Sequence, residues 1–247
     1  DVETISFTPF TRSFNSTYAD LGFERHSKTK HLYFELSNQV SRLSSDSAGN
    51  VQSKDYFFLL PSLWFANEYR TGRRIHANYD MSVNAPSASQ MFTVLDNSNP
   101  QQNAIGERAL RPEQSHNLGF SWSLFDQFSF TSLFVGFSGT YTHDKITNAR
   151  SYDDQLTQIV RPVNVDDDYN GSLSTSFSTP IRKLHTVINL STEVTAARNI
   201  VVLNNQNSIS QSLTHGYELS LENDNNDVID ITIGGRISFT DTKNAAI

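Results

Sequence analysis

The sequence contains no cysteine, which excludes disulfide bonds, thiolate metal sites and cysteine nucleophiles and is compatible with any cellular compartment. It also lacks an apolar run close to the ~20 residues that a transmembrane helix requires. The longest such run extends only from Tyr56 to Ala66 and includes Pro61, which is the length of a membrane-spanning strand. The first residues lack the basic and apolar regions of a signal peptide, so we expect a chain that is mature, truncated or not exported.

Positive charge is scarce as well. The chain has 19 lysine and arginine residues, scattered along its length, and a formal net charge of −7, so a nucleic-acid partner is not expected. Charged residues make up only 18% of the chain, below the roughly 25% of ordinary globular proteins, whereas Phe, Tyr and Trp are abundant. This balance favours β-structure, and 247 residues fit one all-β barrel or sandwich.

Motifs of catalysis are missing. The sequence has no GxSxG, HExxH, Walker or GxGxxG pattern, and its seven histidines are dispersed, so we expect neither an enzyme nor a cofactor. An acidic run at Asp166, Asp167 and Asp168, with Asp153 and Asp154 nearby, has ligands suited to calcium but no EF-hand spacing. We interpret it as a solvated loop.

Strict alternation of apolar and polar residues is what the sequence does contain, and it predicts strands with one apolar face. Helical periodicity is weak throughout. Four segments alternate most clearly, with these apolar sets: Ile75, Ala77, Tyr79, Met81 and Val83; Leu118, Phe120, Trp122 and Leu124; Leu184, Ile188, Leu190 and Val194; and Ile229, Ile231, Ile233, Ile237 and Phe239.

Weaker alternation adds strands and brings the expected number to about ten; they lie near residues 15–26, 31–43, 55–69, 128–142, 169–178 and 213–222. The connections between strands alternate in length. Short polar turns are expected at 26–30, 70–73, 125–128, 179–183 and 223–227, and longer polar stretches at 44–54, 85–113, 143–168 and 198–212. Short turns at one end and long loops at the other describe an up-and-down meander with two unlike rims.

A soluble β-sandwich also alternates apolar and polar residues, so alternation alone leaves a sandwich binding module open. The expected strands are longer than the usual ~5–6 residues. Aromatic residues also gather near the strand ends, where a barrel places its interfacial girdles; examples are Tyr56, Trp64, Phe125 and Phe128. These features favour an all-β, antiparallel, up-and-down transmembrane β-barrel.

Two segments carry a family resemblance. NAPSASQM contains Pro86, Ser87, Gln90 and Met91, and GERALRPE contains Gly106, Leu110, Pro112 and Glu113, with Glu107 and Arg108 in place of the family's Asn-Pro. These segments, and the strand FFLLPSLWF, resemble the β-barrels of TonB-dependent outer-membrane transporters, in particular the outer membrane protein beta-barrel family.

The resemblance implies a bacterial outer-membrane barrel of twenty-two strands, closed around an N-terminal plug and energised through TonB. Residues 1–247 would form about ten strands of the middle of that barrel, because plug and TonB box have no counterpart here. The implied activity is uptake of a scarce nutrient, such as a chelated metal, a glycan or a peptide. The alternative is a non-transporting barrel that serves as a scaffold in a secretion or assembly complex, with a surface lipoprotein or other subunits as partners.

Candidate site residues follow from these faces and loops. In a barrel the apolar face contacts outer-membrane lipid and lipopolysaccharide, and the polar face lines the lumen and meets the plug. The lumen-facing candidates are His76, Asn78, Asp80, Glu193, Asp230 and Arg236, with Glu35, Gln39 and Glu218 on the same face. The 85–113 loop is the longest connection, so we expect it to capture a ligand or partner through Gln90, Met91, Phe92 and Arg108.

The direction of the strands also predicts where the chain ends lie. The strand near 15–26 runs into a short turn, and the strand near 228–240 leaves one. Both ends are therefore expected at the long-loop, extracellular rim, which implies that further strands of the barrel lie outside this chain.

Overall fold

The computed structural model describes residues 10–47, 49–93, 96–99, 101–153, 155–166, 168–223, 229 and 231–246. Ten long strands cross the molecule, and the bounds of the first five are β1 (Phe10–His26), β2 (Lys30–Ser47), β3 (Asn50–Arg70), β4 (Arg73–Asn84) and β7 (Glu113–Asp126). The other five are β8 (Thr131–His143), β11 (Asp168–Ile181), β12 (Thr186–Leu203), β13 (Gln206–Asn223) and β14 (Thr232–Ala246). In the described part of the chain, no helix is long and apolar enough to cross a bilayer.

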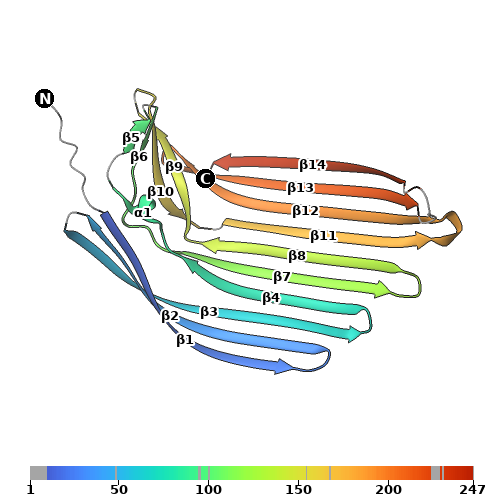
Figure 1. The fold of residues 1–247 in the computed structure, drawn as a ribbon. Helices are drawn as coiled ribbons and strands as arrows, with labels where there is room; N and C mark the ends of the chain where they lie inside the picture. The colour runs from blue at the N-terminus through green and yellow to red at the C-terminus, as the bar shows by residue number, and fades with distance from the viewer. Residues whose placement is uncertain are drawn as a thin grey trace.

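Each long strand pairs antiparallel with the next, in the order β1, β2, β3, β4, β7, β8, β11, β12, β13 and β14 (Figure 1). The expected up-and-down meander of about ten strands is therefore confirmed. In the residues that the structure describes, β1 pairs only with β2, and β14 pairs only with β13, so the sheet is a curved, open wall. No second sheet packs against it in the described ranges, unlike in a sandwich. The closed twenty-two-stranded barrel stays a prediction.

The register between strands gathers the apolar residues on one face of this wall. Phe120 pairs with Ala77 on one side and with Phe137 on the other, and that row continues through Leu173 and Val194. These side chains face outward without a covering layer, since Phe120 is 41% exposed and Ile233 is 69% exposed. A soluble protein rarely exposes so large an apolar surface, whereas hydrocarbon requires one.

The opposite face is polar and bears many small residues. Cross-strand pairs there include Asp80 with Asn117, Ser138 with Ser172, and Glu218 with Arg236. Hydroxyl pairs bridge the strands, as between the Ser138 and Ser172 Oγ atoms at 2.8 Å. The sheet therefore has two distinct surfaces, as the alternation predicts.

The expected loops at 44–54 and 198–212 are wrong. β2 continues to Ser47 and β3 begins at Asn50, and β12 and β13 are joined by Asn204 and Asn205 alone. Both asparagines have positive φ, 49° and 61°, which suits a type I′ hairpin turn. Ser- and Asn-rich sequence indicated loop, but these strand ends contain Leu43, Ile200 and Val202, which are buried in the structure.

Smaller differences concern strand ends. Leu184 belongs to the 3-10 turn η1 (Arg182–Leu184) rather than to a strand, and Ile229 precedes the start of β14. The 85–113 connection contains the helix α1 (Ala88–Met91) and the strands β5 (Asp96–Asn99) and β6 (Gln102–Ala104). The 143–168 connection contains the hairpin β9 (Lys145–Tyr152) and β10 (Gln158–Val165).

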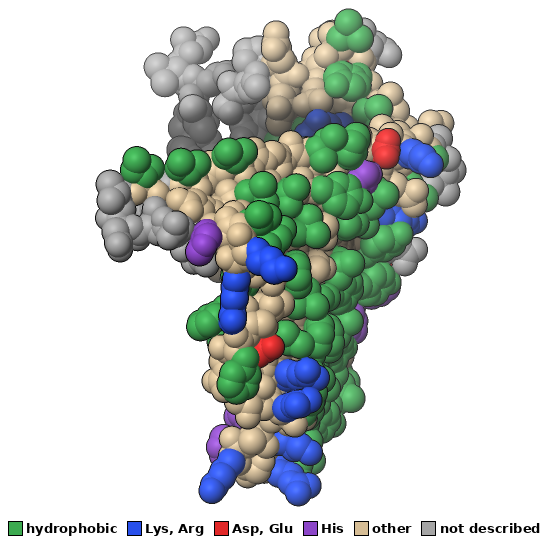
Figure 2. Space-filling view, turned by 90° about the vertical axis from the view of Figure 1, so that its right-hand side faces the viewer, with side chains coloured by type: hydrophobic (Ala, Val, Ile, Leu, Met, Phe, Trp, Pro, Cys, Tyr) green, Lys and Arg blue, Asp and Glu red, His purple; other side chains and the backbone are tan. Residues whose placement is uncertain are grey.

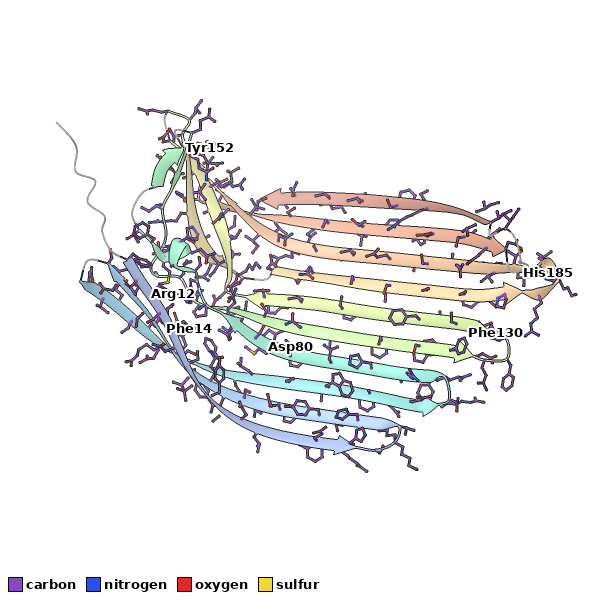
Figure 3. The ribbon with its side chains drawn as sticks, viewed as in Figure 1. Arg12, Phe14, Asp80, Phe130, Tyr152 and His185 are labelled. Atoms are coloured by element: carbon purple, nitrogen blue, oxygen red, sulfur yellow. The ribbon has the colours of Figure 1, made fainter. Side chains whose placement is uncertain are left out.

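These added elements all gather at one rim. β10 pairs antiparallel with β9 and parallel with β6, which forms a small subsheet beside α1 (Figure 1). Both ends of the described chain lie on this same side, as expected. Figure 3 shows Tyr152 at the tip of the subsheet, whereas Phe130 and His185 mark the opposite rim of short turns.

Gly72, in the β3–β4 turn, lies in close contact with the backbone of Phe125 in β7. Its φ is +72°, and a Cβ atom there would lie 2.2 Å from the backbone oxygen of Phe125. Gly72→Ala is expected to lower the free energy of unfolding by about 1–3 kcal/mol, measured by denaturant titration in lipid vesicles. Gly49→Ala is the control, because Gly49 has φ +84° but open space around it. If both substitutions lower the free energy of unfolding equally, backbone strain at positive φ, and not the clash with Phe125, causes the loss of stability.

Candidate functional site

The polar face holds the described lumen candidates in four groups. His76 stands beside Trp64 with ring centroids 5.2 Å apart, and Trp64 in turn contacts His31 at 4.5 Å. The side chain of Asn78 leans over Gly119, where an added Cβ would lie 2.3 Å from its Oδ1 atom. Asp80 accepts a 2.9 Å hydrogen bond from Asn117 Nδ2, and Asn117 Oδ1 accepts one from the Thr140 hydroxyl at 3.0 Å.

Glu193 and Arg236 form the fourth group. Their side chains approach to 3.8 Å across β12, β13 and β14, and both are exposed. They line a shallow groove of about 330 Å³ whose wall also includes Ser174, Gly216 and Glu218. Asp230, the remaining lumen candidate, lies outside the described residues. The groove offers carboxylate, guanidinium and hydroxyl groups to a polar ligand or to a covering domain.

The 85–113 connection is a folded segment that begins at α1. Ser87 caps this helix, because its hydroxyl accepts from Gln90 N while the Gln90 side chain accepts from Ser87 N at 2.8 Å. Met91 is fully buried, and Gly106 N donates to the Phe92 carbonyl at 2.8 Å. The Pro-Ser-x-x-Gln segment is thus a capping box followed by a buried anchor.

Arg108 holds the far side of the same connection. Its guanidinium donates to the backbone oxygens of Ser45, at 3.1 Å, and Asn50, at 2.7 Å, at the end of the β2–β3 hairpin. The ring of Phe92 packs against Phe10 of β1 with centroids 5.3 Å apart. The segment therefore folds over the polar side of β1 and β2, where Ser45 is buried.

The four loop candidates have different outcomes. Met91 is buried, and the polar groups of Gln90 and Arg108 are already used by the fold of the loop. Phe92 is half-buried against Phe10. Their direct contact with a ligand stays a prediction, and the structure assigns all four a part in fixing the loop.

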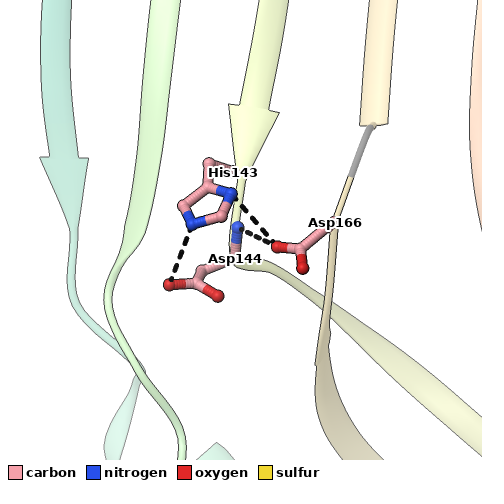
Figure 4. A group of neighbouring side chains, drawn as sticks. All are labelled: His143, Asp144 and Asp166. Atoms are coloured by element: carbon pink, nitrogen blue, oxygen red, sulfur yellow. Dashed lines mark hydrogen bonds and ion pairs between the residues drawn. The ribbon is translucent and has the colours of Figure 1, made fainter.

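Sequence reasoning missed a cluster of charge at the long-loop rim (Figure 4). His143 Nδ1 lies 3.1 Å from Asp166 Oδ1, and His143 Nε2 lies 3.7 Å from Asp144 Oδ2. The three side chains form the one group in the described ranges whose atoms lie close enough to hold a metal ion. However, Asp144, only 7% exposed, already pairs with Arg111 NH2 at 2.5 Å, so the cluster is an ion-pair network.

This network connects three separate segments. Asp144 directly follows β8 and has a positive φ of 55°. Its backbone carbonyl accepts a hydrogen bond from Asn164 Nδ2 at 2.7 Å. The Oδ1 atom of Asn164 in turn accepts a hydrogen bond from Arg111 N at 2.8 Å. Only the acidic run at 166–168 gave a signal in the sequence. The partners Arg111 and Asn164 lie far along the chain from Asp144, so alternation could not reveal them.

Removing Arg111 is expected to loosen this rim. Arg111→Met leaves a buried carboxylate without its cation, which should lower the free energy of unfolding by about 2 kcal/mol and speed amide exchange in β9 and β10. Hydrogen exchange of the folded protein checks it. Arg42→Met is the control, because the Arg42–Asp55 pair at 2.6 Å is exposed at both ends and is expected to contribute little. Unchanged exchange in Arg111→Met would contradict the structural role of the network.

A wall of long antiparallel strands, with an exposed apolar face and a polar inner face, is the architecture of an outer-membrane barrel. The family model described as outer membrane protein beta-barrel family matches residues 13–244. The chain belongs to the outer membrane protein beta-barrel family. No curated protein matches it in sequence. Membership places this barrel wall in the bacterial outer membrane, with its apolar face against lipid.

Proposed function

We propose that this chain forms the barrel wall of a TonB-dependent transporter that takes up a scarce nutrient through a plugged lumen of twenty-two strands. Nutrient classes that suit such a lumen are a chelated metal, a glycan or a peptide. TonB acts indirectly, through the plug. The short turns lie in the periplasm and the long-loop rim outside the cell.

The observation that carries the proposal is the continuous polar inner face. Across ten strands it presents hydroxyl, amide and charged groups, such as Asp80 and the pair of Glu193 with Arg236, rather than the apolar core of a small filled barrel. A wide polar wall needs water or a polar domain beside it. A plug that fills the lumen satisfies these groups and is the part that TonB can move.

The experiment compares three isogenic strains under nutrient limitation: wild type, a deletion of the gene for this chain, and a deletion of TonB. The medium is analysed by mass spectrometry over time. A transporter predicts at least one compound that the wild type depletes and both mutants leave. If every compound depleted by the wild type is equally depleted by both mutants, the proposal fails.

A second candidate function is a non-transporting barrel that acts as a scaffold for a surface lipoprotein or other complex subunits. The observation that favours it is the fixed 85–113 segment, held by the Ser87–Gln90 capping box and by Arg108, which presents a preformed outer surface. Cross-linking from the exposed residue Ser89 in living cells tests it. The scaffold role predicts one dominant partner that persists when TonB is deleted.

A further inference from the structure

Basic side chains gather at the rim of short turns. Figure 2 looks onto this rim and shows lysine and arginine clustered in the lower part of the view. The turn segments 24–31, 68–74 and 181–186 carry eight of them, whereas 125–131 carries none and the fifth short turn, 223–227, has two aspartates and no cation in its sequence. The eight are Arg25, Lys28, Lys30, Arg70, Arg73, Arg74, Arg182 and Lys183. The whole chain has a net charge of −7, so this rim stands out against the rest.

The acidic residues of these turns do not neutralise the rim. Glu24 pairs with His31 at 2.8 Å, and Glu68 pairs with Arg74 at 3.2 Å. Asp126 accepts hydrogen bonds from Phe128 N and from the Ser129 hydroxyl, both at 2.9 Å. In the described part of the chain, no carboxylate forms an ion pair with Arg70 or Arg73, although Asp126 lies close enough to Arg73 for electrostatic attraction.

A cleft of about 840 Å³ lies between the β3–β4 and β7–β8 turns and joins these cations to aromatic rings. Arg70, Arg73 and Arg74 line it together with the carboxylates of Glu68 and Asp126 and the rings of Phe125 and Phe128. Phe128 is 78% exposed. The Gly72 carbonyl accepts from Phe125 N at 2.7 Å, which holds the two turns together. The cleft is thus a fixed feature with guanidinium groups beside apolar rings.

Register places this cleft at the end of the lipid-facing surface. Arg73 pairs with Leu124, and the next outward pair along the same two strands is Ile75 with Trp122. Trp122 Nε1 donates to the Tyr69 hydroxyl at 2.9 Å, which is the arrangement expected where hydrocarbon meets headgroups. A ligand in the cleft can therefore extend its apolar part along the outer face.

We propose that the cleft between the β3–β4 and β7–β8 turns binds the phosphodiester headgroup of an anionic phospholipid in the periplasmic leaflet. Guanidinium groups match phosphate oxygens in charge and in geometry, and the exposed ring of Phe128 accommodates the start of the acyl chains. An acidic protein segment would match the charge but not the adjoining outward apolar surface. This inference rests on family membership and on the short turns facing the periplasm, not on transport.

The test uses the purified protein in vesicles of phosphatidylethanolamine that contain 10% phosphatidylglycerol. Bound lipid is identified by native mass spectrometry after detergent extraction. We expect the ratio of phosphatidylglycerol to phosphatidylethanolamine bound to the wild type to be about tenfold the ratio in the vesicle. Arg70→Gln with Arg73→Gln should abolish this enrichment, and Arg70→Lys with Arg73→Lys should retain part of it, because charge remains while the bidentate geometry is lost.

The matched control is Lys54→Gln with Arg150→Gln, which removes the same charge at the long-loop end and should leave the enrichment unchanged. If the control loses as much phosphatidylglycerol enrichment as the variant with Arg70→Gln and Arg73→Gln, net charge explains the enrichment and the proposal is overturned. Absence of enrichment on the wild type would overturn it too. Loss of enrichment in both Arg70 and Arg73 variants, the lysine pair included, with enrichment kept in the control, would be explained by guanidinium geometry and would support the site.

Discussion

Replacing Phe120 with arginine is expected to impair insertion of the barrel wall into the membrane, at a cost of ~2–4 kcal/mol near the midplane. Phe120 lies in the middle of β7, and its ring is exposed on the outward face, where it has hydrocarbon rather than protein beside it. The free energy of folding into lipid vesicles, measured by denaturant titration, checks this expectation. Ile233→Arg should cost less, because Ile233 is the second residue of β14 and lies near the short-turn rim.

Ser121→Arg is the matched control for Phe120→Arg. Ser121 is the next residue of β7, but its cross-strand partner is His76, so it faces the polar side. An arginine there remains in contact with water or with polar groups and should change the folding free energy little. Equal destabilisation by both substitutions would contradict the assignment of the two faces and with it the membrane orientation of the sheet.

Deleting residues 88–108 is expected to abolish ligand or partner capture while the barrel still inserts. The deletion removes Met91 and Arg108, which anchor the segment over β1 and β2, but Asn84 and Glu113 face each other directly across β4 and β7. The seven residues left between them suffice for a hairpin connection, since loops tolerate shortening better than strands do. Depletion of the nutrient from the medium, or recovery of the cross-linked partner, is the measurement of capture.

A second variant tests whether capture requires the folded segment or only a connection of the same length. In it, a Gly- and Ser-rich sequence of equal length replaces residues 88–108. If the packed segment forms the capture surface, this variant should lose as much activity as the deletion, because Gly106 and Arg108 no longer hold it. Unchanged depletion and unchanged partner recovery in both variants would show that the segment has no part in capture.

Alternation predicted the strands well wherever one face meets lipid. The faces of Phe120 and Ile233 came directly from the sequence, because hydrocarbon demands an apolar residue at every second position. The extended ends of β2, β3, β12 and β13 could not be found in this way, because their buried residues, such as Leu43 and Val202, are covered by other parts of the protein and not by lipid. Turn chemistry at Asn204 and Asn205 was the only available signal there.

The candidate site was less predictable, because its contacts depend on tertiary structure. Gln90 and Arg108 have the side chains of ligand-binding residues, and only the structure shows that a capping box and the backbone of Ser45 use them. The pairing of Arg111 with Asp144 likewise joins segments that no local pattern connects. The described residues predicted to face the lumen share the polar face of the sheet, but alternation gave no information on their hydrogen-bond and ion-pair partners.

The two long hairpins have a consequence for the height of the protein above the bilayer. A strand of 18 residues, such as β12, spans ~60 Å, or ~45 Å vertically at the usual tilt, against an apolar band of ~25 Å. The turns at Gly49 and at Asn204 and Asn205 therefore stand on the order of 15–20 Å above the lipid. At that height they emerge among the sugars of the cell surface, where antibodies and bacteriophages first make contact, and a short epitope inserted there should be displayed on living cells.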